Sequence, residues 1–467
     1  MDLPNFFLAD LPPEASLTPQ LITEACQALK QNRERFLLSR STADMVKVVC
    51  EVGAGWLQPD NRFRRLALEF GPAETGFSAP VLARGLDDFF RQFTPENFNA
   101  LLEQEFGHVH RLDQFVDPTG AETAPRTALA IGPAFLVHIA AGNLPNPTFM
   151  SITLGLLMRS AQLVKCASGA AFLPRLFAHS LYEVDRKLGA CLEIAEWRGG
   201  NHFLEQALYA ETHCVTATGN DETLAAVRAQ LPNGVRFIGY GQRVSFGLVT
   251  REVLRDESIA SVVSRAADDV IAWDQNGCLS PHVIYVEERG LVESDKFAEL
   301  LSVELARREA EAPRGRLTPA EAAAIATRRA LHETLAAHRA DVKIWQSPGS
   351  TAWTVVFEHD VRFQFSCLNR YIFVKPIPDL EVVLQQGLDA VQGKISTVGI
   401  AAWPDKTREL ARILARHGVT RICPLGRMQN PPLTWRHDGR PALADLVTWT
   451  DFETDITPEA TSTPTGT

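Results

Sequence analysis

The sequence predicts an α/β protein with doubly wound parallel sheets, preceded by a mostly helical segment over residues 1–125. From Arg126 onwards, short apolar runs alternate with helical patterns, which is typical of parallel sheets covered by helices on both faces. Polar loops with Gly and Asn follow several of these runs, as in sheets that bind ligands at the strand ends. The first hundred residues instead repeat apolar residues at helical spacing.

Composition narrows the class of protein. The 467 residues are 45% hydrophobic and 22% charged, which fits a soluble chain of two or three domains. The formal net charge of -10 argues against nucleic-acid binding, for which clustered positive charge is typical. Eight scattered cysteines predict no metal site and a reducing cytoplasm. No signal peptide pattern opens the chain, and His138 and prolines interrupt its longest apolar region, so we expect no membrane insertion.

The segment 1–125 carries helix-start signals but no chemistry. Thr18 and Thr94 are each followed by proline, and a threonine cap before proline is a common helix start. We expect this segment to pack on the next domain and to help shape a substrate site.

Residues 126–247 are predicted to form a Rossmann-like cofactor domain. The runs 127–133 and 135–140 are the first expected strands, both buried in a parallel sheet. A loop with Gly142, Asn143 and Pro145 follows, and then a helix over 148–158, which puts the loop at a strand's carboxyl end. Strands over 162–166, 192–197, 213–218 and 235–238 alternate with helices over 172–188 and 222–231. The chain has no G-x-G-x-x-G fingerprint.

Cys278 lies in the loop 274–282, directly before a β-rich run over 283–286. Backbone holds such a cysteine on one side and leaves it open on the other, which suits an attacking thiolate. Most cysteines are inert core residues, and Asn276-Gly277 is an ordinary turn dipeptide. The polar loops upstream set Cys278 apart from the other cysteines, and we predict that it is the catalytic nucleophile.

A second α/β domain is expected over 248–424. Helices are predicted over 296–308 and 318–338, the second opened by a capping box of Thr318 and Glu321. Strands are predicted over 353–357, 371–375 and 398–402. The segment 425–467 should return to the first domain, with a structural turn from Trp435 to Gly439 and a disordered tail from about 457.

Taken together, these motifs resemble the aldehyde dehydrogenase superfamily. Within it they are most similar to the acyl-CoA reductase family typified by the fatty-acid reductase subunit of bacterial luminescence. The resemblance covers roughly residues 128–453. It rests on His138-x4-Asn143-x-Pro145, on the stretch 273–281 around Cys278, and on the C-terminal stretches 421–426 and 435–439. It implies an aldehyde dehydrogenase-like fold with a cofactor-binding and a catalytic domain.

The resemblance also implies roles for individual residues. Asn143 would form an oxyanion hole with the backbone N–H of Cys278. Lys165 would contact the adenosine ribose or its phosphate. The cofactor's pyrophosphate would lie beside the turn made by Thr218, Gly219 and Asn220. Gly199, after the strand 192–197, is also expected to bind the cofactor.

Two departures from the usual aldehyde dehydrogenase pattern sharpen the expectation. Ser168 stands where a glutamate often binds the ribose hydroxyls, so a 2'-phosphate is not repelled and we expect NADPH. The stretch 237–241 lacks the glutamate that activates water to hydrolyse the acyl-enzyme. An acyl group on Cys278 would therefore be spared from water and could react with hydride or with a thiol.

The expected reaction is the NADPH-dependent reduction of an acyl thioester, from CoA or a carrier protein, to the aldehyde. His138 could relay a proton, although a histidine in an apolar strand is more often a satisfied core group. A conventional aldehyde dehydrogenase and a non-redox acyl-transfer subunit that uses the same cysteine are the alternatives. We also expect a homo-oligomer and, as a partner, an acyl-activating synthetase.

Overall fold

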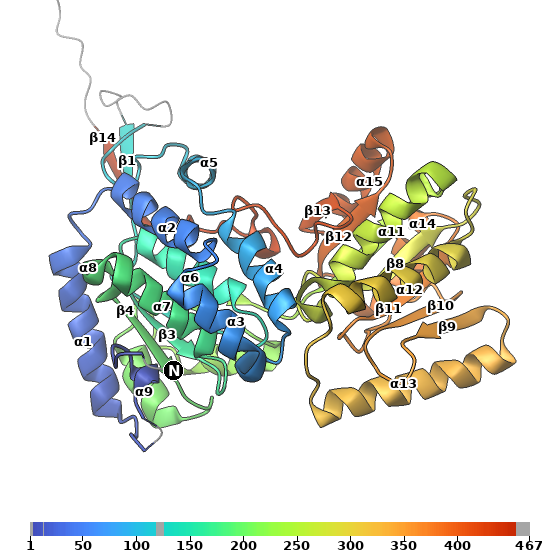
Figure 1. Cartoon of the computed structure of the whole chain (residues 1–467). Helices are drawn as coiled ribbons and strands as arrows, with labels where there is room; N and C mark the ends of the chain where they lie inside the picture. The colour runs from blue at the N-terminus through green and yellow to red at the C-terminus, as the bar shows by residue number, and fades with distance from the viewer. Residues whose placement is uncertain (1–2, 13, 118–125, 454–467) are drawn as a thin grey trace, which may run out of the picture.

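The computed structural model describes residues 3–12, 14–117 and 126–453. Two α/β lobes lie side by side, and the N-terminal helices surround the first of them (Figure 1). Within the described ranges, no helix has both the length and the apolar character that crossing a membrane requires.

The N-terminal segment is helical, as predicted. After a short turn, η1 (Leu8–Asp10), it forms α1 (Pro19–Phe36), α2 (Thr42–Trp56), α3 (Arg62–Thr75), α4 (Ala79–Phe90) and α5 (Pro95–Phe106). The hydroxyls of Thr18 and Thr94 accept hydrogen bonds from the first turns of α1 and α5. Trp56 is fully buried, and its indole donates to Ser180 Oγ of the first lobe at 2.9 Å. The segment therefore shares a hydrophobic core with that lobe.

The first lobe contains a doubly wound parallel sheet, which confirms the predicted fold class. Its strand order is β4-β3-β2-β5-β6, and every neighbouring pair is parallel. After β2 the chain first adds β3 and β4 on one side of it and later adds β5 and β6 on the other side. A topological switch point therefore lies between the carboxyl ends of β2 and β5. The strands are β2 (Phe135–Ile139), β3 (Ala161–Cys166), β4 (Leu192–Glu196), β5 (Cys214–Thr218) and β6 (Arg236–Tyr240).

The helices of this lobe differ from prediction at one point. They are α6 (Asn146–Leu157), α7 (Phe172–Val184), α8 (Arg186–Gly189), α9 (His202–Ala210) and α10 (Asp221–Gln230). The single helix predicted over 172–188 divides at Asp185, which is extended and caps α8 through its carboxylate. An aspartate that bonds nearby backbone N–H groups competes with a continuous helix.

The prediction that 127–133 is a buried strand of the parallel sheet is wrong. Residues Arg126–Ile131 form β1, which pairs antiparallel with β14 (Thr448–Glu453) in a separate two-stranded sheet. The partner strand comes from the far end of the chain, which a local pattern cannot reveal. Figure 1 shows β14 beside β1, where the C-terminal segment has returned to the first lobe. The tail expected to be disordered from about 457 lies outside the described residues.

The second lobe contains a sheet of order β13-β12-β7-β8-β11-β10-β9, parallel except for the edge strand β9. The strands are β7 (Val244–Val249), β8 (Pro281–Glu287), β9 (Val342–Gln346), β10 (Thr354–Glu358), β11 (Tyr371–Ile377), β12 (Ile395–Ala401) and β13 (Arg421–Pro424). The boundary predicted at 247 falls inside β7, which already pairs with β8 and β12 of this lobe.

The sheet of the second lobe has helices on both faces. Its main helices are α11 (Asp256–Ile271), α12 (Ser294–Glu311), α13 (Pro319–His338) and α15 (Pro404–Arg416). Shorter turns are η2 (Arg251–Val253), η3 (Ala272–Gln275), α14 (Leu380–Val382), η4 (Val383–Gly387), η5 (Asp389–Val391) and η6 (His437–Gly439). The capping box predicted from Thr318 and Glu321 opens α13.

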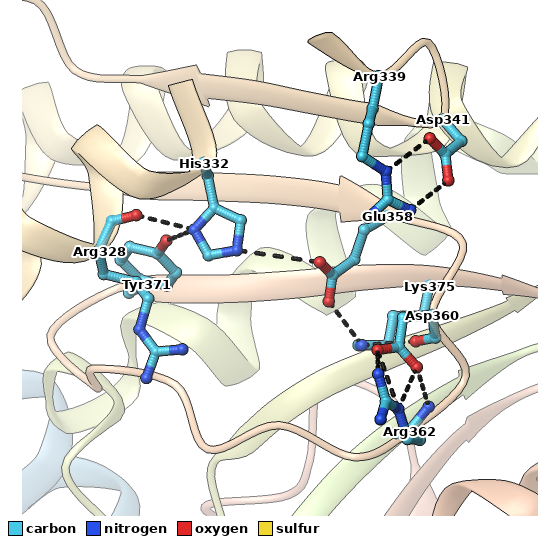
Figure 2. A network of polar contacts seen from close by, with 9 residues as sticks. All are labelled: Arg328, His332, Arg339, Asp341, Glu358, Asp360, Arg362, Tyr371 and Lys375. Carbon is cyan, nitrogen blue, oxygen red and sulfur yellow. Dashed lines mark hydrogen bonds and ion pairs between the residues drawn. The ribbon is translucent and has the colours of Figure 1, made fainter. Parts of the chain in front are cut away.

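A buried polar network joins α13 to this sheet (Figure 2). Lys375 Nζ of β11 is fully buried and lies 2.7 Å from Glu358 Oε1 of β10. The other Glu358 oxygen is 3.9 Å from His332 Nε2 of α13, and His332 Nδ1 lies 3.0 Å from the Tyr371 hydroxyl. Because a buried charge is costly without a partner, each of these groups fixes the position of the next.

Candidate active site

Cys278 lies in a tight turn between η3 and β8, with its side chain exposed. Its carbonyl oxygen accepts a hydrogen bond of 2.9 Å from Ser245 Oγ of β7. A Cβ on the preceding residue, Gly277, would meet the Gln429 amide, which would have to move away from its contact with Ser280 Oγ. The backbone is therefore fixed on one side while the thiol remains accessible on the other.

The approach to the turn is conformationally strained. Trp273, Asp274 and Gln275 have φ values of 50°, 48° and 66°, in a region that non-glycine residues rarely adopt. A second run, Leu368, Asn369 and Arg370, repeats this with φ values of 57°, 53° and 64°. Such residues each cost on the order of 1–3 kcal/mol and persist only where tertiary contacts fix them.

Contacts between the two strained runs supply that support. Arg370, only 1% exposed, places Nη2 2.7 Å from Asp274 Oδ1, and its Nη1 is 2.7 Å from Glu309 Oε2. Gln275 Nε2 donates to the carbonyl oxygen of Tyr371 at 2.9 Å. We call the Asp274–Arg370 ion pair the loop clamp, because it joins the approach to Cys278 to the start of β11.

The environment of Cys278 favours the thiol over the thiolate. Its side chain is reached from a cavity but is surrounded by protein atoms, and this desolvation raises the pKa of the thiol to about 12, with a smaller contribution from the Asp438 carboxylate. The thiol therefore carries its proton at neutral pH. Nucleophilic attack requires a group that removes this proton.

The cavity beside Cys278 has a volume of about 640 Å³ and lies between the lobes. That volume is typical of small-molecule sites. Its walls come from α4, α6, the end of α11, and the segment that follows β13. The apolar lining residues include Val81, Phe89, Leu144, Met150, Leu154, Trp273, Leu279, Leu433 and Trp435. Thr218 and Tyr240, at the ends of β5 and β6, line the same cavity, so the first sheet and Cys278 share one space.

Asn143 lies next to the cysteine turn. Its side-chain Nδ2 donates to the backbone oxygen of Asn276 at 3.0 Å. A primary amide has two N–H donors, so one remains for a second acceptor. The structure thus brings Asn143 and the cysteine turn together across the two lobes.

His138 instead lies inside the first sheet, only 3% exposed. Nδ1 is 2.6 Å from Thr216 Oγ1, and Nε2 is 2.8 Å from Gln162 Oε1. Burial lowers the pKa of His138 to about 4, so the ring is neutral at physiological pH. Both nitrogens are occupied, which favours a satisfied core histidine over a proton relay.

The residues predicted to hold a cofactor gather at the carboxyl ends of β3, β4 and β5. Lys165 is buried at the end of β3, where its ammonium lies 5.7 Å from the Trp197 ring centre. Desolvation lowers the pKa of Lys165, which a negatively charged ligand would offset. Trp197 Nε1 is buried without a hydrogen-bond partner among the described residues. Gly199 borders the same ammonium, because a Cβ placed on it would lie at van der Waals distance, 3.8 Å, from Lys165 Nζ.

The turn after β5 makes hydrogen bonds to other residues of the protein. Asn220 Oδ1 accepts a hydrogen bond from Thr223 N at 2.8 Å and caps α10. Gly219 N donates to the carbonyl oxygen of Tyr240 at 3.2 Å. Thr218 is the member of this turn that lines the cavity with Cys278.

Ser168 is exposed after β3, but a carboxylate lies close to it. Glu196, at the end of β4, accepts a hydrogen bond of 2.7 Å from Gly169 N. A glutamate is therefore present beside this loop even though it is not at position 168. Sequence reasoning missed it because Glu196 belongs to the neighbouring strand.

Three further residues at the site were missed. Arg370 and Gln429 come from distant segments, and neither lies in a motif that would single it out. His437 lies in a stretch expected to be a structural turn, yet it lines the cavity with Cys278. Only the folded chain brings these side chains to the cysteine.

Comparison with known proteins identifies related sequences. The model of a family described as acyl-CoA reductase (LuxC) matches residues 37–449. The chain is 23% identical over 361 residues to a long-chain acyl-protein thioester reductase 2 from Photobacterium leiognathi, covering 76% of this chain and 70% of the relative. A long-chain acyl-protein thioester reductase from Aliivibrio fischeri is also 23% identical, over 358 residues.

Solved structures of aldehyde dehydrogenases share the fold. Bifunctional proline utilization A (PutA) superposes with a TM-score of 0.69 at 17% identity, over 95% of this chain but only 45% of that protein. An NAD-dependent benzaldehyde dehydrogenase from Corynebacterium glutamicum superposes with a TM-score of 0.68 at 12% identity, over 94% of this chain and 91% of that one. The expected aldehyde dehydrogenase-like fold is thus confirmed.

Proposed function

Since the chain belongs to the acyl-CoA reductase (LuxC) family, we propose that it reduces a fatty acyl thioester to the aldehyde with NADPH, through an acyl intermediate on Cys278. The single observation that carries this proposal is the cavity in which Cys278 meets both apolar walls and Thr218 of the first sheet. An acyl chain and a nicotinamide cofactor can therefore reach the same sulfur.

The chemistry begins at the sulfur. Cys278 attacks the thioester carbonyl, the C–S bond of the substrate breaks, and the acyl group is now carried by the enzyme. Asn143, through its second amide N–H, is the proposed donor to the oxyanion, together with the Cys278 backbone N–H. A nicotinamide cofactor supplies the hydride that reduces the acyl group to the aldehyde.

Residues at the ends of β3 to β5 fit such a cofactor. The indole N–H of Trp197 has no acceptor among the residues that the structure describes, and the Lys165 ammonium is a buried cation that an anion would stabilise. In our proposal Lys165 and Ser168 hold the adenosine ribose and its 2'-phosphate, and Thr218, Gly219 and Gly199 lie along the pyrophosphate. Asn220 supports that turn by capping α10.

The walls of the cavity favour a fatty acyl group as substrate. Each methylene that leaves water for an apolar wall contributes about 0.8 kcal/mol, or roughly a fourfold gain in kcat/KM. NADPH consumption with aldehyde trapping across acyl-CoAs of increasing length should rise by that factor per methylene and then level off. A Cys278→Ala variant should consume no NADPH.

The same assay tests the alternatives. Acylation of Cys278 without NADPH use would favour a non-redox acyl-transfer subunit. Oxidation of aldehyde with no reduction of any thioester would favour a conventional aldehyde dehydrogenase. A thioester on a carrier protein, an acyl-activating synthetase as partner, a homo-oligomer and a cytoplasmic location remain part of the proposal. All eight cysteines are free thiols, which suits a reducing compartment.

A further inference from the structure

Asp438 is a buried carboxylate with an unused oxygen beside the active-site cavity. Its side chain is 4% exposed, and Oδ2 lies 3.2 Å from Arg243 Nε. Oδ1 has no hydrogen-bond partner within the described ranges. A buried acceptor without a donor is costly, so such a group in a folded protein needs an explanation.

The His437 side chain carries a potential donor near Asp438 Oδ1. Its Nε2 lies 3.9 Å from Asp438 Oδ1, too far for a hydrogen bond but within the range of an ion pair. The imidazole stacks in parallel on Tyr240, at 4.3 Å and 8°, and contacts the Trp435 ring at 4.7 Å. Two aromatic rings therefore fix its plane.

The imidazole of His437 borders the cavity that also contains Cys278. Tyr240 and Trp435 line the same cavity. In the described part of the chain, neither ring nitrogen makes a hydrogen bond. His138, by contrast, has both nitrogens occupied inside the sheet.

The charges around His437 set its protonation state. Burial lowers its pKa, the Arg243 guanidinium lowers it further, and the Asp438 carboxylate raises it. The pKa of Tyr240 rises to about 12, so that neighbour is an uncharged phenol. The other charged side chains that act on Tyr240 and Cys278 nearby are Arg421, Arg440 and Asp445. His437 is therefore a neutral base at physiological pH, and it lines the same cavity as the Cys278 thiol.

We propose that His437 is the proton carrier of the acylation step and that Asp438 is its positioning residue. The inference rests on the proposed function and assigns a base to it. His437 takes the proton of the Cys278 thiol as the sulfur forms its bond to the thioester carbon. Asp438 Oδ1 then faces an imidazolium. When the C–S bond of the substrate breaks, His437 gives the same proton to the departing thiolate, and both sulfur atoms and the imidazole end neutral.

The test is the rate of Cys278 acylation by tetradecanoyl-CoA without cofactor, followed by rapid-quench mass spectrometry from about pH 5 to about pH 9. In the wild type, the rate should be flat at high pH and fall tenfold per pH unit below an inflection that lies under about 6.5. His437→Phe keeps the stack on Tyr240 but has no proton carrier. At neutral pH it should acylate about 10²-fold more slowly or worse, and its rate should rise with pH throughout.

Two further variants separate chemistry from folding. Asp438→Asn keeps the shape and suits the left-handed backbone there, where φ is 53°. This variant should move the inflection of the pH–rate profile to lower pH and lower the acylation rate at its plateau. The result can be read whether or not His437→Phe folds. His417→Gln changes an exposed histidine of the second lobe and should behave as wild type.

The acylation rates and inflections of these variants show which of the two proposals fails. A His437→Phe protein that is acylated within threefold of the wild-type rate, with the same inflection, overturns the inference and leaves the proposed function intact. If that variant is unfolded, an unchanged inflection in Asp438→Asn overturns it instead. A wild-type protein that no thioester acylates contradicts the proposed function, and the inference with it.

Discussion

Removing the charge of Asp274 tests whether the loop clamp holds the Cys278 turn in place. Asp274→Asn keeps the size of the side chain, and asparagine tolerates the left-handed backbone, where φ is 48°. What it removes is one charge of a buried pair, since Arg370 is 1% and Asp274 3% exposed. Breaking such a pair costs about 3–5 kcal/mol. Glu309 still contacts Arg370, so we expect the lower end, about 3 kcal/mol.

Hydrogen exchange of residues 273–281, measured by mass spectrometry, is the assay. A loss of about 3 kcal/mol should increase the open population of this loop about 10²-fold, and Cys278 acylation should slow with it. Asp405→Asn removes a charge from an exposed pair with Arg408 and is the matched control, because exposed pairs contribute little. If the two variants exchange at the same rate over 273–281, the clamp does not position the cysteine.

Two other contacts and the burial of two histidines lead to further expected outcomes. Gly277→Ala should lower turnover about 10- to 100-fold, because the added methyl group displaces the Gln429 amide. The double variant with Gln429→Ala should regain part of the lost turnover. A Gly277→Ala turnover equal to wild type would contradict this packing. Glu196→Gln should raise the NADPH to NADH ratio of kcat/KM several-fold, because it removes a negative charge near the proposed 2'-phosphate; an unchanged ratio places Glu196 outside the ribose site. Burial lowers the pKa of His138 and of His282 to about 4, so both bind protons more readily when unfolded. The free energy of unfolding should therefore fall as pH drops from about 6.5 to about 4, by up to roughly 3 kcal/mol for each histidine. In His138→Gln, the urea concentration at the unfolding midpoint should depend less on pH than in the wild type.

The parts of the fold that local patterns encode could be predicted from the sequence. The caps at Thr18, Thr94 and Thr318 each open a helix, because capping depends on residues within one turn. Apolar runs that alternate with helical patterns predicted the parallel sheets, because this pattern is also local in the sequence. The strand β1 was assigned to the wrong sheet because its partner, β14, lies more than 300 residues away in sequence.

The site was predictable only in part. Asn143 and Cys278 lie in loops with recognisable residues, and the structure brings those two loops together. His138 belongs to an equally suggestive motif but has both nitrogens bonded inside the sheet, and no sequence pattern reports hydrogen-bond partners. Glu196 lies at the end of β4 and Arg370 in the turn before β11, and only their tertiary contacts reveal them.

Mass spectrometry of the protein after exposure to a fatty acyl-CoA without cofactor tests the role of Cys278 directly. We expect a gain of one acyl group on the peptide that contains Cys278, its loss when NADPH is added, and release of the matching aldehyde. Cys367→Ser should acylate normally, since that half-buried thiol lies away from the cavity lining. An acyl group on a different cysteine, or aldehyde formation by a Cys278→Ala protein, would contradict the assignment of Cys278 as the nucleophile.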